Sequence, residues 1–554
     1  MGTAAARRQV LEGQPCARGM AFGRARVLRP LHFEISEKTI GQRRIPAEVK
    51  RFERALADAQ AEMERVRATL SGSLAAELGE ILDAHAMLLD DPTFIDAVRQ
   101  RIRDERVAAH TALKRERDRL MGEFAAIDDP YLRSRSEDFD QVIGRVVNAL
   151  YSDLREPIDP ASLAGEIIVA DQVAPADLAH WYEHGVLGIV TAGGSPLSHV
   201  AILTRSMQLP MLCGVADAQS RVRDGDVLML DAEGGRLVVH PDADDQADFE
   251  QWRKDHARDQ QRLNRLRKAP TRTRDGSEIA LWVNAERPED VSLAHAAGAV
   301  GVGLYRTEFL FLQGNTLPDE DEQYEAYAAI VRAMQGRPVT IRTLDVGADK
   351  ADRTGLALAN EANPALGLRG VRLSLTRPDV FTTQIRAILR AAAHGPVRVL
   401  VPMVTNAAEI KAVRKLFKPA RKALENAGVE IGERVELGAM IEVPAAAITI
   451  DSILAEAEFV SIGTNDLAQY LLATDRNNDS VSQLYDPAHP ALAFLIERVV
   501  TAAGAASRRV AVCGEMAGDP LHIERLLHLG VRELSMHPGA LLQARRRIGE
   551  ITLA

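Results

Sequence analysis

Residues 437–470, LGAMIEVPAAAITIDSILAEAEFVSIGTNDLAQY, hold two short apolar runs, and a helical pattern follows each of them. Such an alternation is typical of buried parallel strands covered by helices. It extends from Pro270 nearly to the end of the chain and includes six further strand candidates. Eight such units in about 285 residues predict one (β/α)8 barrel. The candidates are residues 279–285, 301–307, 339–345, 398–404, 437–443, 459–465, 510–515 and 533–537.

Polar residues end most of these strands, and the active site of a (β/α)8 barrel lies at the carboxyl ends of its strands. A single charge at such a place is usually solvated or paired within a loop, but so many at one rim favour a site. The residues are Arg306, Glu308, Arg342, Asp345, Glu442, Asn465, Asp466, Cys513 and Glu515, with Arg369 and Arg476 in nearby loops.

The chemistry of these side chains points to an anionic small molecule. Guanidinium groups such as those of Arg306, Arg342 and Arg476 bind phosphate and carboxylate in a bidentate manner. Glu442 and Asp466 follow neighbouring strands and offer the oxygen ligands that Mg²⁺ or Mn²⁺ prefers. Together these residues predict a phosphorylated, carboxylated substrate that is held for phosphoryl transfer.

Phosphoryl transfer needs a nucleophile, and the rim offers none better than an acidic residue. GGSPLSHVAILTRS, residues 193–206, places His199 behind two glycines and a proline, where a helix begins. A histidine there is more often a polar cap or a half-buried filler, but an exposed imidazole could accept a phosphoryl group. The backbone N–H groups of the loop and the helix start would face the phosphate, and Arg205 could reach back to it. At the rim, Cys513 is either a core thiol or the donor of a proton to a carbanion or enolate.

The chain before the barrel changes character several times. Residues 15–30 predict a strand segment, and residues 35–154 predict about four charged, alanine-rich helices in a bundle of two antiparallel hairpins. Short apolar strands in residues 155–240 predict a compact α/β domain that the N-terminal strand segment completes. Residues 243–268 are helical and almost entirely polar, which is typical of a connector between domains.

The composition excludes several classes of protein. The apolar fraction of 46% and the charged fraction of 26% are those of an ordinary globular protein. No apolar run approaches the roughly 18–20 residues that span a bilayer, and the N-terminus has no secretory h-region. A net charge of −10 without long basic runs argues against nucleic acid as a partner. Three distant cysteines, Cys16, Cys213 and Cys513, predict a reducing cytosol and no disulfide framework.

Five blocks of the barrel region resemble, in order, the signature blocks of Enzyme I of the phosphoenolpyruvate-dependent phosphotransferase system, the phosphoenolpyruvate–protein phosphotransferase. They are GVGLYRTEFLF, IRTLDVGADK, NPALGLRGVRLSL, VSIGTNDLAQY and VAVCGEMAGD. The resemblance covers nearly the whole chain and implies a multidomain α and α/β protein. Its parts would be an N-terminal strand segment (1–30), a helical domain that binds the acceptor protein HPr (31–154), a swivelling α/β phosphohistidine domain (155–242), a linker helix (243–268) and a phosphoenolpyruvate-binding barrel that also forms a homodimer (269–554).

The resemblance also implies a role for each site residue. His199 would carry the phosphoryl group on Nε2, Arg205 would support it, and Cys513 would protonate enolpyruvate to pyruvate. Glu442 and Asp466 would ligate Mg²⁺. Phosphoenolpyruvate would be bound by Arg306, Arg342, Asn465, Asp466 and Arg476, with Arg369 nearby. HPr would dock on DAHAMLLDDP through His85, Met87 and Leu88. The family implies a cytoplasmic enzyme, without membrane insertion, that begins the sugar phosphotransferase system.

The chain departs from the family pattern in three places. Three residues, where the family usually has two, separate Gly194 from Ser198 and His199, and Ala174 stands where a threonine is common. Family members also usually continue with a helical segment after HPGALLQARRRIGEITLA. No sensor domain precedes residue 15, which favours the sugar branch over the nitrogen-regulatory branch. The rival interpretations are a relative of pyruvate,phosphate dikinase, whose nucleotide loop the first 150 residues lack, and an inactive regulatory scaffold.

Overall fold

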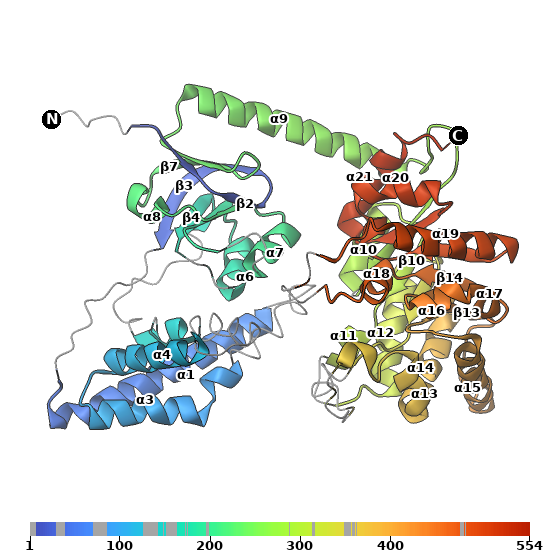
Figure 1. The fold of residues 1–554 in the computed structure, drawn as a ribbon, viewed down its shortest axis with the longest axis horizontal. Helices are drawn as coiled ribbons and strands as arrows, with labels where there is room; N and C mark the ends of the chain where they lie inside the picture. The colour runs from blue at the N-terminus through green and yellow to red at the C-terminus, as the bar shows by residue number, and fades with distance from the viewer. Residues whose placement is uncertain are drawn as a thin grey trace. The chain divides into compact units, whose positions relative to one another are not determined.

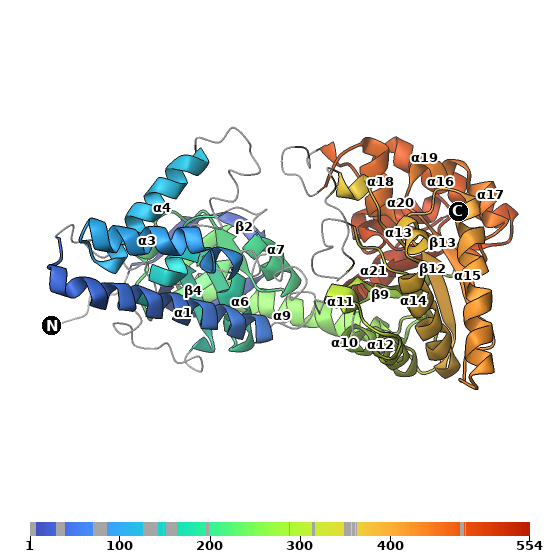
Figure 2. The same cartoon turned by 90° about the horizontal axis from the view of Figure 1, so that it is seen from below.

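The computed structural model of the chain describes residues 7–28, 39–69, 86–125, 142–147, 149–150, 163–171, 173, 175–194, 199–286, 288–312, 316–347, 356, 361, 363–476, 481 and 484–553. They divide into two compact units, Met1–Ala257 and Arg258–Ala554 (Figures 1 and 2). Among the helices that the described ranges contain, none has the length and apolar character that crossing a membrane requires.

An eight-stranded sheet forms the centre of the first unit, with the strand order β1-β8-β7-β3-β4-β5-β6-β2. The four strands from β3 to β6 run parallel, while the strands on either side of them pair antiparallel. The N-terminal segment supplies three of the eight strands and so lies in the same sheet as residues 166–239. The strands are β1 (Gln9–Glu12), β2 (Gln14–Ala17), β3 (Met20–Leu28), β4 (Glu166–Ala170), β5 (Gly188–Thr191), β6 (Met211–Cys213), β7 (Val227–Asp231) and β8 (Arg236–Val239).

Helices cover this sheet and extend beyond it. Buried side chains of the long helices, such as Phe52, Val98 and Leu113, form one apolar cluster with Ile168 and Trp181 of the sheet region. The helical segment and the sheet of this unit therefore share a core. The helices are α1 (Ile45–Thr69), α3 (Pro92–Asp104), α4 (Ala109–Ala125), α6 (Pro175–Glu183), α7 (His199–Ser206) and α8 (Ala218–Arg221), with the 3-10 turn η1 (Gln42–Arg44). Parts of the predicted two-hairpin bundle lie outside the described residues.

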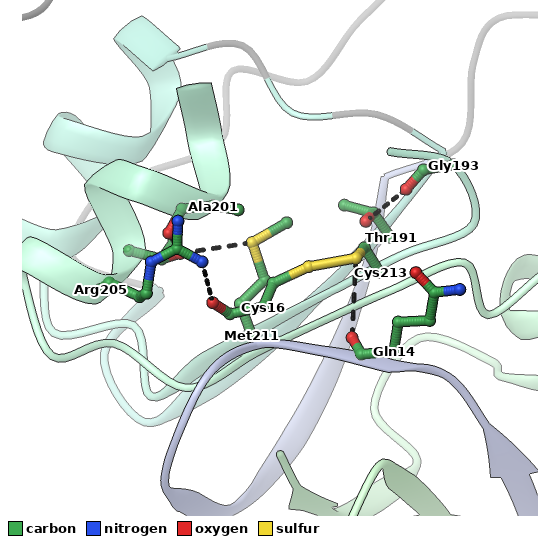
Figure 3. Close-up of a disulfide and its surroundings, with 9 residues drawn as sticks. Gln14, Cys16, Thr191, Gly193, Ala201, Arg205, Met211 and Cys213 are labelled. Atoms are coloured by element: carbon green, nitrogen blue, oxygen red, sulfur yellow. Dashed lines mark hydrogen bonds between the residues drawn. A yellow bond between two sulfur atoms is a disulfide. The ribbon is translucent and has the colours of Figure 1, made fainter. Parts of the chain in front are cut away.

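The first unit contains a disulfide, so the prediction that the three cysteines form no disulfide framework was wrong. Cys16 of β2 and Cys213 of β6 are 197 residues apart in the chain, and their Cα atoms are 6.3 Å apart in the structure (Figure 3). Antiparallel pairing of the two strands brings the thiols together. Sequence spacing gives no sign of this, because only the sheet order places an N-terminal edge strand beside β6. The third cysteine, Cys513, is free and buried.

The helix α9 (Ala243–Arg265) crosses the boundary between the two units, and the 3-10 turn η4 (Leu266–Lys268) follows it. Near the start of α9, Asp245 pairs with Arg8 of the first unit at 2.6 Å. Near its end, Asp259 pairs with Arg546 of the second unit at 2.7 Å. Each end of the connector is therefore fixed to a different unit by an ion pair.

Eight parallel strands close into a barrel in the second unit, which confirms the predicted (β/α)8 fold. Each predicted run contains its strand to within one residue, because strands buried on both faces appear as short continuous apolar runs. The strands are β9 (Ala280–Ala285), β10 (Val302–Tyr305), β11 (Val339–Arg342), β12 (Val397–Val401), β13 (Glu436–Ile441), β14 (Phe459–Ile462), β15 (Arg509–Val512) and β16 (Glu533–Met536).

Helices surround the barrel, and local sequence signals fix several of their starts. Asp319 with Glu322, and Asn406 with Glu409, form capping boxes at the first residues of α12 and α15. The helices are α10 (Pro288–Ala296), α11 (Glu308–Leu312), α12 (Glu320–Ala333), α13 (Val371–Thr376), α14 (Pro378–Ala391), α15 (Ala407–Asn426), α16 (Pro444–Ile448), α17 (Ile450–Leu454), α18 (Thr464–Leu472), α19 (Pro490–Ala505), α20 (Pro520–His528) and α21 (Leu541–Ile548), with the 3-10 turns η6 (Pro364–Leu366), η7 (Ala392–His394), η9 (Glu515–Ala517) and η10 (Pro538–Ala540).

Candidate functional site

The predicted rim residues all lie at or just beyond the carboxyl ends of barrel strands. Arg306 directly follows β10, Arg342 is the last residue of β11, and Glu442 directly follows β13. Asn465 and Asp466 lie in the first turn of α18, which begins two residues after β14 ends. Cys513 follows β15 and precedes the turn η9 that Glu515 begins. Parallel strands place all of these positions at one end of the barrel.

A buried cluster of charges occupies this end of the barrel. Arg342 is 9% exposed and pairs with Glu308 at 3.1 Å and with Asp345 at 3.3 Å. Arg369 makes two bonds to the carboxylate of Asp345, at 2.9 and 3.1 Å. Burial would lower the pKa of Arg342, but the charges of Glu308 and Asp345, with those of nearby carboxylates, outweigh it and raise the pKa.

Asp345 is the central anion of this cluster. Burial raises its pKa, but the positive charges of Arg342 and Arg369 prevail, and the net shift is downward. The backbone N–H of Asp345 donates to Glu308 Oε1 at 2.9 Å, which ties the end of β11 to the start of α11. Two guanidinium groups are therefore held in fixed positions by one ionised carboxylate, an arrangement suited to a bound dianion.

Negative charges dominate the surroundings of Glu442, whereas positive charges dominate those of Asp345. Glu442 is 1% exposed, and burial together with the negative charges of Asp466 and Asp345 raises its pKa to about 8. Arg342 and a 2.7 Å hydrogen bond from the backbone N–H of Met403 oppose this shift without cancelling it. A bound cation stabilises a carboxylate such as Glu442, whose ionisation is disfavoured by burial and by neighbouring negative charges.

The residues present fit a magnesium ion that the protein holds only in part. Across the described residues, no group of three or more His, Cys, Asp or Glu side chains converges as a complete metal site. Mg²⁺ usually keeps several waters and binds through one or two carboxylates plus substrate oxygens, which Glu442 and Asp466 would satisfy.

The remaining two predicted arginines pair with carboxylates that the sequence did not assign to them. Arg306 Nη1 donates to Glu286 Oε1 at 2.9 Å, and Arg476 Nη1 donates to Glu515 Oε1 at 3.1 Å. Glu515 also accepts a 2.8 Å bond from Asn465 Nδ2. An anionic ligand would therefore compete with intramolecular carboxylates for these guanidinium groups.

Cys513 is buried at the carboxyl end of β15. Its side chain is 3% exposed and packs inside the barrel with Leu400, Met440 and Phe459. Burial raises the pKa of the thiol to about 11, which the hydroxyl of Ser461 only partly opposes. The thiol therefore holds its proton at neutral pH. Its neighbour must be glycine, because a Cβ at Gly514 would lie 2.0 Å from Thr464 Oγ1.

Several residues of the barrel mouth were not predicted. Asn284 and Glu286 lie at the end of the first barrel strand, where the sequence WVNAE already shows polar residues after an apolar run. Asn284 Nδ2 donates to the carbonyl of Cys513 at 3.0 Å. Tyr470 of α18 lies 3.4 Å from Arg369 Nη1, and Gln384 of α14 reaches the ends of β10 and β11. No sequence signal marks these two, because a polar residue on a helix is usually solvated.

His199 is the first residue of α7, and the residues between Gly194 and His199 lie outside the described ranges. Gly194 has a φ of +92°, which favours glycine, and Thr191 Oγ1 donates to the carbonyl of Gly193 at 2.8 Å. Arg205, in the last turn of α7, donates to the carbonyl of Cys16 at 2.9 Å (Figure 3). Arg205 thus links the histidine helix to the strand that the disulfide holds. Ala174 also lies outside the described residues.

The predicted docking face for HPr is only partly described. His85 lies outside the described residues. Met87 is 75% exposed, whereas Leu88 is half-buried and packs against the apolar core of the first unit. Met87 is therefore the one of these three residues whose described side chain presents a large apolar surface to solvent.

Three family models match the chain in order. They are PEP-utilising enzyme, N-terminal (residues 12–135), PEP-utilising enzyme, mobile domain (163–235) and PEP-utilising enzyme, PEP-binding domain (260–553). The chain is 42% identical over 548 residues to a phosphoenolpyruvate-protein phosphotransferase of Cupriavidus necator. The alignment covers 97% of this chain and 94% of that protein. The chain is also 36% identical over 549 residues to the protein of the same name from Geobacillus stearothermophilus, covering 99% of this chain and 94% of that one. A solution structure of an Enzyme I protein (nEIt) covers 45% of this chain and 99% of that chain, with 26% identity and a TM-score of 0.38.

Proposed function

The chain belongs to the phosphoenolpyruvate–protein phosphotransferase family, and on that premise we propose that it transfers the phosphoryl group of phosphoenolpyruvate to its own His199 and then to an HPr-type protein. The P–O bond of phosphoenolpyruvate breaks as the bond between phosphorus and the imidazole Nε2 forms. The enolate that leaves gains a proton at carbon and becomes pyruvate.

The barrel mouth supplies the binding groups for this reaction. Arg342 and Arg369, held by Asp345, bind the phosphate and carboxylate, and Arg306 and Arg476 exchange their carboxylate partners for the substrate. Asn465 donates a hydrogen bond from its amide. Glu442 and Asp466 would hold Mg²⁺, which would supply positive charge to offset the negative charge of the reacting group. The single observation that carries the proposal is the pair of guanidinium groups, of buried Arg342 and partly buried Arg369, that Asp345 orients, because fixed guanidinium groups bind phosphate and carboxylate in a bidentate manner.

The protonation step is assigned to Cys513. Its raised pKa keeps the thiol protonated at neutral pH, and its backbone carbonyl is fixed by Asn284. A neutral acid in an apolar surrounding can give its proton to a carbanion, and the thiolate regains a proton from water. The same burial also suits a core thiol, so this role needs its own test.

The downstream partner is proposed from the family and from the first unit. We place HPr on the helical segment around Met87, whose exposed thioether suits an apolar partner surface. Phosphate then passes from His199 to a histidine of HPr in the sugar phosphotransferase branch, and the nitrogen-regulatory branch is the alternative. We propose a cytoplasmic setting from the family resemblance. Because Cys16 and Cys213 form a disulfide, the cysteines do not support this proposal.

The barrel carries an apolar surface that we propose as a homodimer interface. Ile448, Leu484, Phe494 and Leu521 are each more than half exposed. Ile448 lies beside α19, since Arg498 of that helix bonds its carbonyl, and Phe494 belongs to the same helix. Large exposed apolar side chains on neighbouring helices, such as Ile448 and Phe494, favour association with another protein surface.

The experiment that tests the function is incubation with phosphoenolpyruvate labelled in its phosphate. The wild-type protein should acquire one acid-labile, base-stable phosphate and release pyruvate, and the label should pass on when HPr is added. His199→Ala should acquire none while it still binds phosphoenolpyruvate. Label on His199→Ala would overturn the assignment of the nucleophile.

The rival functions give different results in the same assay. A dikinase relative would need ATP for its phosphohistidine, and an inactive scaffold would take up no label. Transfer to an HPr of the sugar system, compared with its nitrogen-regulatory counterpart, separates the two branches. A strong preference for the nitrogen-regulatory carrier would replace the sugar assignment.

A further inference from the structure

Gln384, on α14, carries a side-chain amide that joins three elements of the barrel. The residue is 1% exposed. Its Oε1 accepts a 3.1 Å hydrogen bond from the backbone N–H of Leu344, and its Nε2 donates to Thr307 Oγ1 at 3.3 Å and to the hydroxyl of Tyr327 at 3.1 Å. A buried amide with its bonds made in this way holds its partners at fixed separations.

The partners of Gln384 lie next to the residues that form the charged cluster. Thr307 stands between Arg306 and Glu308, and its hydroxyl donates to the carbonyl of Arg342 at 3.0 Å. Leu344 directly precedes Asp345. One side chain from an outer helix therefore contacts the chain just beyond the ends of both β10 and β11.

The position of Leu344 explains why its backbone N–H needs a side chain as hydrogen-bond acceptor. The ladder between β11 and β12 ends with Arg342 opposite Leu400, and the N–H of Thr343 bonds the carbonyl of Leu400. The next backbone N–H, that of Leu344, lies beyond the end of β11 and donates to Gln384 Oε1. Because buried backbone donors need a partner, this bond determines where the chain turns before Asp345.

We propose that Gln384 is a positioning residue for the anion-binding cluster, acting through Leu344 and Thr307 to fix Asp345 and thereby the guanidinium groups of Arg342 and Arg369. It touches no substrate itself. The proposal rests on the proposed function only for the identity of the anion, phosphoenolpyruvate. The physical precedent comes from metal sites, where groups that orient the metal ligands typically change affinity or activity 10–100-fold when removed.

Gln323, which bonds the same tyrosine hydroxyl as Gln384, provides a matched control residue. Gln323 of α12 is also 1% exposed, accepts a 3.2 Å bond from the same hydroxyl and donates to the carbonyl of Pro318 at 3.0 Å. It contacts neither strand end in these bonds. Gln384→Met and Gln323→Met both replace a buried amide by an unbranched apolar chain of similar length, so both should lower thermal stability by a similar amount.

The two variants should differ in substrate binding. We expect Gln384→Met to raise the KM for phosphoenolpyruvate roughly tenfold, with a smaller fall in kcat, and Gln323→Met to leave KM within about twofold of wild type. Amide hydrogen exchange of a peptide spanning residues 343–347 should be faster in Gln384→Met than in Gln323→Met. Equal KM values in the two variants would reduce Gln384 to a core amide and overturn the proposal.

Two further measurements test the proposal if Gln384→Met does not fold or if the protein does not use phosphoenolpyruvate. If Gln384→Met does not fold, Thr307→Val removes the hydroxyl between Gln384 and the Arg342 carbonyl, and it should raise KM in the same direction. If the wild-type protein does not use phosphoenolpyruvate, the proposed function fails. The exchange comparison still decides the role of Gln384, since equal protection of residues 343–347 in both variants would overturn it.

Discussion

Glu442→Gln should stabilise the protein when divalent cations have been removed, although it should abolish activity. Burial and the charge of Asp466 raise the pKa of Glu442 from 4.5 to about 8. The folded chain therefore holds a proton on Glu442 that the unfolded chain releases as pH rises above 4.5. The folded protein therefore loses stability progressively as pH rises from about 4.5 to about 8, where Glu442 ionises in the folded chain as well.

The size of the effect follows from this shift. Each pH unit between the two pKa values costs about 1.4 kcal/mol, so at pH 7 the wild-type protein should be less stable than Glu442→Gln by up to about 3 kcal/mol. The difference should reach about 5 kcal/mol above pH 9 and vanish near pH 4. Glutamine keeps the acceptor for the backbone N–H of Met403, so that hydrogen bond is retained.

Urea unfolding, followed by Trp282 fluorescence in a Trp181→Phe/Trp252→Phe background, reports the barrel alone, because Trp282 is the barrel's tryptophan. The measurement compares both proteins from pH 5 to pH 9 in EDTA and then in excess Mg²⁺. Magnesium at about 100 times its Kd should stabilise the wild type by about 2.7 kcal/mol and leave Glu442→Gln unchanged. Glu425→Gln, on the exposed face of α15, removes the same charge and serves as the control.

Two results would contradict this reasoning. One is a Glu442→Gln protein that is less stable than wild type at every pH in EDTA, which would mean that ionised Glu442 stabilises the empty barrel. The other is a wild-type stability in EDTA whose pH dependence matches that of Glu442→Gln. Equal stabilisation of both proteins by Mg²⁺ would place the metal elsewhere.

The remaining predictions concern the cysteines and the dimer. Cys513→Ser should lower pyruvate release about 10²–10⁴-fold while phosphorylation of His199 persists or slows, and parallel pyruvate and phosphohistidine assays check it; a wild-type pyruvate rate would return Cys513 to the core. Cys16→Ser should lower the stability of the first unit by about 2–5 kcal/mol in urea unfolding, because the disulfide closes a long loop. A thiol reductant should lower the wild type to the same value and leave Cys16→Ser unchanged, and insensitivity of the wild type would contradict a bonded pair. Phe494→Asp should shift the protein from dimer to monomer in sedimentation velocity, and an unchanged dimer would exclude this surface.

Sequence patterns predicted the barrel because each strand carries its own signal. A strand buried on both faces needs a continuous apolar run, and a polar residue at its carboxyl end follows directly in the sequence. The rim residues from Arg306 to Cys513 could therefore be named before their positions in space were known. Five ordered blocks added the family, and the relatives confirm that part of the prediction.

The partners of those residues could not be named in the same way. The pairing of Arg476 with Glu515 and the bonds from Gln384 to Leu344 and Thr307 join positions that are 39 or more residues apart. Which loops meet depends on the curvature of the closed barrel, and no local pattern records it.

The sequence by itself determined the barrel, its eight strands and the side chains at its mouth, since hydrophobic periodicity and strand ends are local properties of the chain. Only the tertiary structure decided the pKa of Glu442, the burial of Cys513 and the bond between Cys16 and Cys213. Electrostatic shifts depend on the charges and the solvent within a few ångströms of a group. Thiol pairing likewise depends on which strands become neighbours in the sheet, and folding alone brings those groups together.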